Sequence, residues 1–198
     1  MLSLIDIAII GKEIRYSLFS EITFGYIIIQ IVGFIGTGLF FVSFQCKTNK
    51  NLFRVQLLSY TFYTVHLFLL GATTGALSYV LNGVRSFCLG SSFKFAHSKW
   101  AMIILCVLQL AVMGFTWSGW ISILPVAANI ATTIGGYTHN PQKVRIAGMF
   151  VNSPLWIIYD IIVGSWAGIM DEVVSEISMI VSIIRFGWKE LDVVENDR

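Results

Sequence analysis

Charged residues are scarce in this chain. Its 198 residues include 13 Lys and Arg and 11 Asp and Glu, so 12% are charged, whereas a soluble domain carries about 25%. Hydrophobic residues make up 56%, and the mean hydropathy is +0.78. This composition excludes an ordinary soluble fold and predicts an integral membrane protein with the lipid bilayer as its main partner. The net charge of +2 gives no reason to expect a nucleic acid as a partner.

The sequence also lacks the usual signatures of metal sites and catalysis. The cysteines are Cys46, Cys88 and Cys106, and the histidines are His66, His97 and His139. No C-x-x-C pair occurs, and the histidines are too far apart to give a familiar ligand spacing. There is no G-x-S-x-G, no H-E-x-x-H and no phosphate-binding loop. We therefore expect no metal, no cofactor and no enzymatic activity.

Seven apolar runs are each close to the length of about 20 residues that crosses a bilayer. They are Phe24–Phe44, Leu52–Leu70, Ala72–Cys88, Trp100–Thr116, Trp117–Tyr137, Ile146–Val163 and Ser165–Phe186. The apolar run Leu2–Ile10 is too short to span, so residues 1–23 are expected to form a surface helix or a poorly ordered tail. Residues 187–198 form an acidic tail that we expect to lie in water.

Positive charges in the connections predict the orientation of the chain. Lys and Arg occur after the first, third, fifth and seventh runs, for example Lys47, Lys94 and Lys143. The other three connections, around Gly71, Trp117 and Gly164, contain none. Because Lys and Arg favour the cytoplasmic side, the N-terminus is predicted outside and the C-terminus inside.

The chain resembles itself at an offset of 93 residues. GATTG at 71–75 then aligns with GSWAG at 164–168, and Lys50 with Lys143. The fold class predicted is all-α: two parallel three-helix repeats, 24–91 and 117–186, joined by a linker helix at 92–116. In the first run, Gly33, Gly36 and Gly38 are expected to let neighbouring helices approach closely.

Several stretches resemble the YgjV-type bacterial inner-membrane proteins, a group similar to the SWEET and PQ-loop carriers. They are SFQCKTNKN, LLGATTGALSYVLNGVRSF, LPVAANIATTIGGYTHNPQKVR and SPLWIIYDIIVGSWAGI. The resemblance covers about residues 24–186 and implies a multi-pass protein of the bacterial inner membrane. It also implies proline hinges in both halves, and only Pro125 and Pro154 in the second half fit that pattern.

Six residues are candidates for contact with a solute. They are Tyr63, Asn82, Arg85, Asn129, Trp156 and Glu176. The SWEET resemblance implies an asparagine near Asn82 and aromatic side chains, here Tyr63 and Trp156, that stack on a sugar ring. Each residue also has a structural interpretation: a hydrogen bond between helices for Asn82, a structural polar contact for Asn129, packing for the aromatics, extension to the membrane surface for Arg85, and a pair with Arg85 for Glu176.

The acidic residues within the spans suggest two kinds of environment. We expect Arg85 and Glu176 to share the interior of the bundle, as a structural pair or as part of a solute site, because charges inside a membrane usually need a partner. Asp160 and Asp171 lie nearer the outer ends of their spans, where exterior water could solvate them.

The function expected is movement of a small polar solute, sugar-like or another small metabolite, through a central cavity by alternating access. The alternative is a non-transporting membrane scaffold or partner subunit with a SWEET-like fold. The two repeats could make a monomer complete, and a homodimer is also compatible with the sequence.

Overall fold

The computed structural model of the chain describes residues 23–43, 49–91, 93–138 and 140–188, which are helical apart from short connections and contain no strand. The helices are α2 (Phe24–Ser43), α3 (Asn49–Leu69), α4 (Thr73–Gly90), α5 (Lys99–Phe115), α6 (Ile123–Tyr137), α7 (Pro141–Arg145), α8 (Ser153–Val163) and α9 (Trp166–Phe186). Three shorter elements are η1 (Lys94–His97), η2 (Trp120–Ser122) and the π-helical turn η3 (Ile146–Asn152), which joins α7 to α8. The predicted surface segment, the loop containing Cys46 and Lys47, and the acidic tail lie outside the described residues.

The fifth and sixth predicted spans differ most from the observed helices. Residues 117–119 form an irregular connection in which Gly119 has φ 98°, so α6 begins only after η2. The sixth helical segment begins earlier than expected, at Pro141. Asn140 caps it, because its side-chain oxygen accepts hydrogen bonds from the backbone N–H groups of Gln142 and Lys143 at 3.0 and 3.2 Å.

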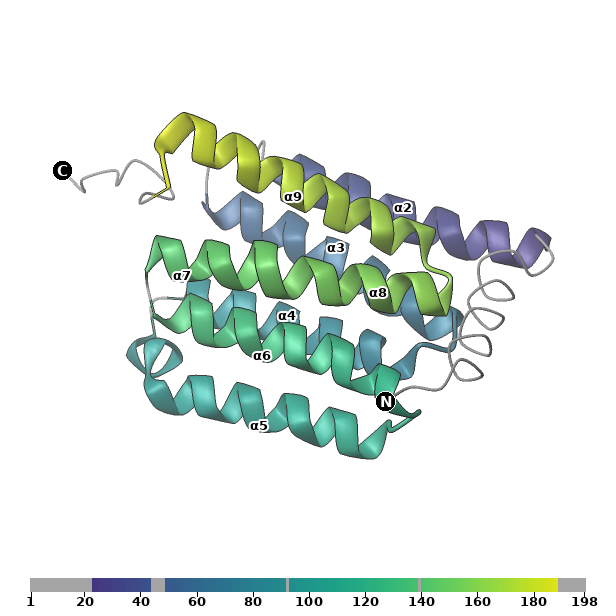
Figure 1. Cartoon of the computed structure of the whole chain (residues 1–198), viewed down its shortest axis with the longest axis horizontal. Helices are drawn as coiled ribbons and strands as arrows, with labels where there is room; N and C mark the ends of the chain where they lie inside the picture. The colour runs from purple at the N-terminus through teal and green to yellow at the C-terminus, as the bar shows by residue number, and fades with distance from the viewer. Residues whose placement is uncertain (1–22, 44–48, 92, 139, 189–198) are drawn as a thin grey trace, which may run out of the picture.

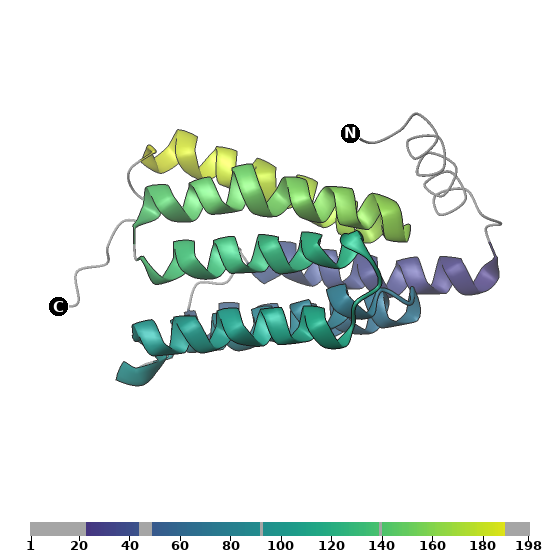
Figure 2. The same cartoon turned by 60° about the horizontal axis from the view of Figure 1, so that its bottom comes forward.

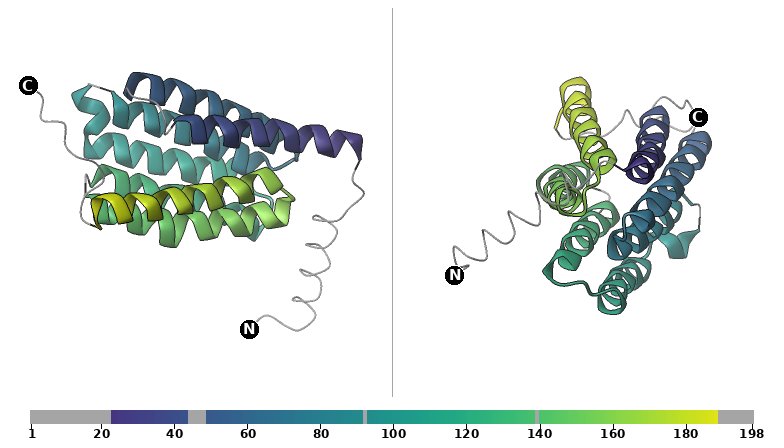
Figure 3. Two further views of the ribbon diagram at one scale, coloured as in Figure 1. Left: turned by 90° about the horizontal axis from the view of Figure 1, so that it is seen from above. Right: turned by 90° about the vertical axis from the view of Figure 1, so that its right-hand side faces the viewer.

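Six helical segments form a closed ring (Figures 1 and 3). Contacts follow the order α2, α3, α4, α6, α8, α9 and back to α2, while α5 packs outside the ring against α4 and α6. Consecutive long helices alternate in direction, so α2, α4, α6 and α9 run the same way (Figure 1). Because α5 is a single extra helix, the three helices before it and the three segments after it have matching directions.

Polar side chains fill the inside of this bundle, and apolar side chains cover its outside. Among the residues that the structure describes, buried polar or charged residues outnumber buried hydrophobic ones and include His66, Asp160, Asp171 and Glu172. The exposed surface carries many large apolar side chains on every long helix. This is the reverse of a soluble protein, whose buried residues are mostly apolar, and it suits a bundle surrounded by lipid.

Within the described part of the chain, two helical segments are long and apolar enough to cross a membrane by length and composition alone: Phe24–Val42 and Gln142–Val163. A shorter apolar helix is Lys99–Phe115. The remaining long helices are less apolar because they supply the polar interior. For example, α9 contains Asp171, Glu172 and Glu176, and α4 contains Asn82 and Arg85.

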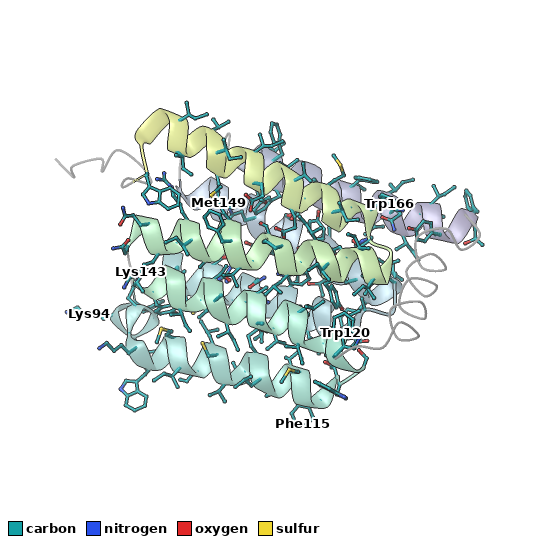
Figure 4. All side chains as sticks on the ribbon, in the orientation of Figure 1. Lys94, Phe115, Trp120, Lys143, Met149 and Trp166 are labelled. Carbon is teal, nitrogen blue, oxygen red and sulfur yellow. The ribbon has the colours of Figure 1, made fainter. Side chains whose placement is uncertain are left out.

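The two ends of the bundle differ in chemistry. Lys94 and Lys143 lie at one end, which we call the basic end, whereas Phe115, Trp120 and Trp166 lie at the other, the aromatic end (Figure 4). At the basic end the buried Arg145 donates a hydrogen bond to the carbonyl of Gly187, just after α9.

Two turns at the aromatic end have the same geometry. Gly71 has φ 75° and Gly164 has φ 72°, a left-handed conformation that favours glycine. In the first turn the N–H of Ala72 donates to the carbonyl of Leu67 at 2.8 Å, and in the second the N–H of Ser165 donates to that of Asp160 at 2.8 Å. Every residue in the second turn is 93 positions after its counterpart in the first.

The segment from Pro141 to Val163 is continuous (Figure 2) but changes geometry in its middle. Its π-helical turn ends just before Pro154, which cannot donate a backbone hydrogen bond and crowds the preceding turn. Pro125, by contrast, lies in the first turn of α6, where proline disrupts nothing. Only Pro154 is therefore placed to act as a hinge within a long helical segment.

Glycines allow α2 to lie directly against α3 and α9. A Cβ atom on Gly33 would be 2.5 Å from the Cβ of Ala167 and 2.9 Å from the His66 ring, and one on Gly36 would be 3.0 Å from the Tyr63 ring. The expected close approach is confirmed at both positions. It is wrong for Gly38, which has nothing within 4 Å, because this glycine faces away from both neighbours.

We predict that Gly33→Ala destabilises the protein, whereas Gly38→Ala in the same helix does not. The Gly33 change should destabilise the protein by about 1–3 kcal/mol through overpacking. The Gly38 change should be neutral or stabilise by up to about 1 kcal/mol, because alanine is the better helix former. Thermal unfolding in detergent measures both, and equal midpoints for the two variants would contradict the close packing of α2 on α9.

Candidate functional site

Two amides and an indole meet inside the ring. The Asn82 side chain on α4 donates to the Asn129 side-chain oxygen on α6 at 3.0 Å, and the Trp156 indole N–H on α8 points at the same oxygen at 3.4 Å. Asn129 in turn donates to the carbonyl of Ser78 at 3.2 Å. All three side chains are buried, and the side-chain oxygen of Asn82 has no hydrogen-bond partner. We call Asn82, Asn129 and Trp156 the amide–indole cluster.

A row of aromatic rings continues from this cluster across the bundle. Tyr63 on α3 and Tyr79 on α4 are stacked, with centroids 5.0 Å apart and planes 13° apart. Tyr79 also contacts Trp156 at 4.8 Å, and Trp156 meets Tyr159 edge-on at 5.5 Å. These rings fill the space between α3, α4 and α8 and form the hydrophobic part of the interior.

Polar side chains of α2 and α3 bind the start of α9. Gln30 donates to the carbonyl of Gly164 at 2.8 Å and accepts from the N–H of Ala167 at 3.2 Å. The hydroxyl groups of Thr37 and Tyr63 contact each other, and both lie 3.2 Å from the carbonyl of Ala167. These bonds hold the α8–α9 turn against α2, so the first and last long helices close the ring.

Asp160 and Asp171 are not solvated at the outer ends of their helices, contrary to expectation. Asp160 is 1% exposed and Asp171 6% exposed. The Asp160 carboxyl group rests on Gly168 of α9, where a Cβ atom would lie 2.4 Å away. Asp171 interacts with the Tyr63 side chain. Both helices turn these carboxyl groups into the ring because their opposite faces are apolar.

The expected pair between Arg85 and Glu176 does not form. The Arg85 guanidinium instead donates to the Thr132 hydroxyl on α6, with Tyr60 and Tyr137 as its other electrostatic neighbours. Glu176 is half-buried, one of its oxygens has no hydrogen-bond partner, and it lies close to Glu172. The two side chains do not meet, because Arg85 faces α6 rather than α9.

Of the six candidates, Asn82, Asn129 and Trp156 contact one another, and Tyr63 joins them through Tyr79. Arg85 and Glu176 lie elsewhere. Sequence reasoning did not select Tyr79 or Gln30. Tyr79 lies one turn before Asn82 on the same helix face, and Gln30 is a lone amide seven residues before Thr37, so helical spacing alone contained the signal.

Residues 27–190 match the model of the Imp-YgjV family, described as a bacterial inner membrane protein. The match covers most of the chain, so this protein belongs to the YgjV family of bacterial inner membrane proteins. No curated protein matches the chain, and no solved structure matches it.

We predict measurable coupling between the two asparagines. In a double-mutant cycle of Asn82→Ala and Asn129→Ala, the interaction energy should be about 0.6–1.7 kcal/mol, the range for hydrogen bonds between membrane helices. The control cycle combines Asn82→Ala with Thr138→Ala, at the exposed end of α6, and should be additive within about 0.5 kcal/mol. Equal values in the two cycles would contradict the contact.

Proposed function

We propose that this YgjV-family protein is a multi-pass carrier that moves a small polar solute, sugar-like or another small metabolite, across the inner membrane by alternating access. The observation that carries the proposal is the amide–indole cluster, in which the Asn82 side-chain oxygen is buried without a partner. In lipid-embedded helices such a group is costly unless it has a function or a bound partner. A solute hydroxyl or amine is the partner we propose.

The chemistry of the cluster suits a polar ring compound. Asn82 and Asn129 offer amide donors and acceptors, while Trp156, Tyr79 and Tyr63 offer flat apolar faces. Together they could bind hydroxyl groups at the edge of a sugar-like ring and stack on its face. Arg85 and Glu176, farther towards the basic end, would contact the solute after it leaves this cluster.

The arrangement of three helices, the single helix α5 and three further helical segments supports a carrier with two moving units. Within the ring, the first three helices make the same contacts as the last three: α2–α3 corresponds to α6–α8, α3–α4 to α8–α9, and α4–α6 to α9–α2. In several pairs related by the 93-residue offset both residues are buried, such as Tyr63 with Trp156 and His66 with Tyr159. The matching Gly71 and Gly164 turns agree with this symmetry. Carriers with repeats of this kind rock one unit against the other around the solute.

The closed interior is also compatible with the rival function, a non-transporting scaffold or partner subunit. The aromatic row packs beside the amide–indole cluster, and a surface pocket of about 410 Å³ lies between α3 and α4, lined largely by exposed apolar residues such as Leu57, Val84 and Phe87. In a carrier this closed form is one state of the cycle, whereas in a scaffold it is the permanent form.

The orientation proposed has the basic end in the cytoplasm. In cysteine-free protein we predict that Ser118→Cys, at the aromatic end, reacts with a membrane-impermeant thiol reagent in intact cells. Lys143→Cys, at the basic end, should react only after the inner membrane is opened. Both side chains are exposed in the structure, so access is decided by the membrane alone. The reverse pattern would place the N-terminus in the cytoplasm.

We predict that a solute from a panel of sugars, nucleosides, amino acids and vitamins raises the melting temperature of the purified protein. At a concentration of about 100 times its Kd, a ligand stabilises the folded state by about 2.7 kcal/mol. The shift should disappear in Asn82→Ala and Trp156→Ala but remain in Trp120→Ala, which removes a half-exposed tryptophan at the aromatic end. Flux into proteoliposomes then tests transport of any solute that binds, and binding without flux would favour the scaffold.

A further inference from the structure

Three buried carboxyl groups meet where α8 and α9 pack together. They belong to Asp160, Asp171 and Glu172, which are 1%, 6% and 5% exposed. Asp160 lies close enough to both others to interact electrostatically, and so do Asp171 and Glu172 with each other. We call these residues the carboxyl cluster. Like charges at such close range in a medium of low dielectric constant repel strongly if all are ionised.

Among the residues that the structure describes, no positively charged side chain bonds to the carboxyl cluster. None of its members forms an ion pair in the part of the chain that the structure describes. The titratable side chains facing it are His66 and Tyr63 from α3, Tyr79 from α4, Tyr159 from α8 and Glu176 from α9. Arg85 bonds to α6 instead, and Arg145 bonds to the carbonyl of Gly187 at the basic end.

Several buried oxygen atoms at the cluster have no hydrogen-bond partner. They include Asp160 Oδ2, Asp171 Oδ1 and Glu172 Oε2. The hydroxyl of Ser153 is also without a partner, although this residue is only 1% exposed and its side chain interacts with Glu172. An ionised carboxylate can only accept hydrogen bonds, whereas a protonated one can also donate. A proton on one of the carboxyl groups would therefore supply a donor, which ionised carboxylates lack.

The hydrogen bonds of Ser165 also indicate that this region binds a proton. His66 Nδ1 lies 2.8 Å from the carbonyl of Ile29, which only accepts, so this nitrogen carries hydrogen. If His66 is neutral, its Nε2 must accept the single hydroxyl hydrogen of Ser165, 2.8 Å away. The Ser165 side chain also interacts with Asp160, and it then offers that carboxyl group only a lone pair.

Two arrangements satisfy all three side chains. Either Asp160 is protonated and donates to Ser165, or His66 is the cation, Ser165 donates to Asp160, and Asp160 is ionised. Each arrangement contains one more proton than the state with neutral His66 and ionised Asp160. Binding of one proton therefore satisfies the hydrogen bonds among His66, Ser165 and Asp160.

We propose that Asp160, Asp171 and Glu172, with His66 and Ser165, form a proton-binding site in the interior of the bundle. The described residues include no group of three or more His, Cys, Asp or Glu side chains arranged to hold a metal ion, so a proton fits the site better than a divalent cation. This site supplies the coupling ion for transport. That role rests on the proposed carrier function, whereas the binding of the proton does not.

Infrared spectroscopy of the full-length protein reconstituted in lipid tests the site without a solute. Carboxyl groups in contact with water are ionised at neutral pH, so a band from protonated carboxyl C=O groups reports buried ones. We expect this band at neutral pH, a shift of the band in heavy water, and its loss on strong alkalinisation. Absence from the wild-type protein of both this band and the ring vibrations of a protonated His66 would overturn the proposal and leave the carrier function standing.

Single variants locate the proton. Asp160→Asn, Asp171→Asn and Glu172→Gln keep the shape of a protonated carboxyl group, and at least one of them should remove a measurable part of the band while the protein elutes as a monodisperse species. Glu176→Gln is the comparison on the same helix, and because Glu176 is only half-buried it should remove less of the band than the cluster variant with the largest effect. A band that disappears only in Glu176→Gln, or that is replaced by carboxylate absorption when sodium is added at constant pH, would contradict a proton site at the cluster.

Discussion

The outer surface of this bundle is apolar, as contact with lipid requires, and in an inner membrane protein this constraint bears on how the interior is built. Lipid offers no hydrogen bonds, so every polar side chain within the helices must find its partners inside. Asn82, Asn129, Gln30 and His66 all do so through bonds between helices that are far apart in sequence. Burial of apolar surface cannot hold such helices together, because lipid tails are equally apolar. Close packing at Gly33 and these polar contacts therefore provide the specificity of the ring.

The polar side chains of the interior fall into two groups, one well hydrogen-bonded and one with unsatisfied oxygen atoms. The junction of α2, α3 and the α8–α9 turn is well bonded, since Gln30 uses both its donor and its acceptor there and Thr37 and Tyr63 share the carbonyl of Ala167. The amide–indole cluster and the carboxyl cluster retain buried oxygens without partners. Unsatisfied groups are rare in membrane interiors and usually mark function. The fold thus fixes the turns at the aromatic end and leaves free binding capacity between the helices.

Helical content and approximate span boundaries could be predicted from the sequence, because apolar runs and glycine turns are local signals. The contact of Asn82, Asn129 and Trp156 agrees with their selection as one site, since each is a polar or aromatic residue in the middle of a span. The wrong predictions concern the direction in which a side chain points from its helix. Asp160 and Asp171 were expected to face outer water from their depth alone, and Arg85 was expected to meet Glu176. Which face of a helix points to which neighbour depends on the order of helices around the ring, and local spacing does not contain that information.

The separation of charge within the bundle is a further argument that its carboxyl groups are not structural. A structural ion pair would place Arg85 beside Glu172 or Glu176, since an unpaired buried charge costs far more than a paired one. Instead Arg85 bonds to neutral Thr132, while the carboxyl cluster faces tyrosines, a serine and a neutral or protonated histidine. A site without a fixed counter-ion can accept and release a proton without first breaking a salt bridge. Its position beside Tyr63 and Tyr79, at the edge of the aromatic row, means that a change of charge would be felt where the solute is proposed to bind.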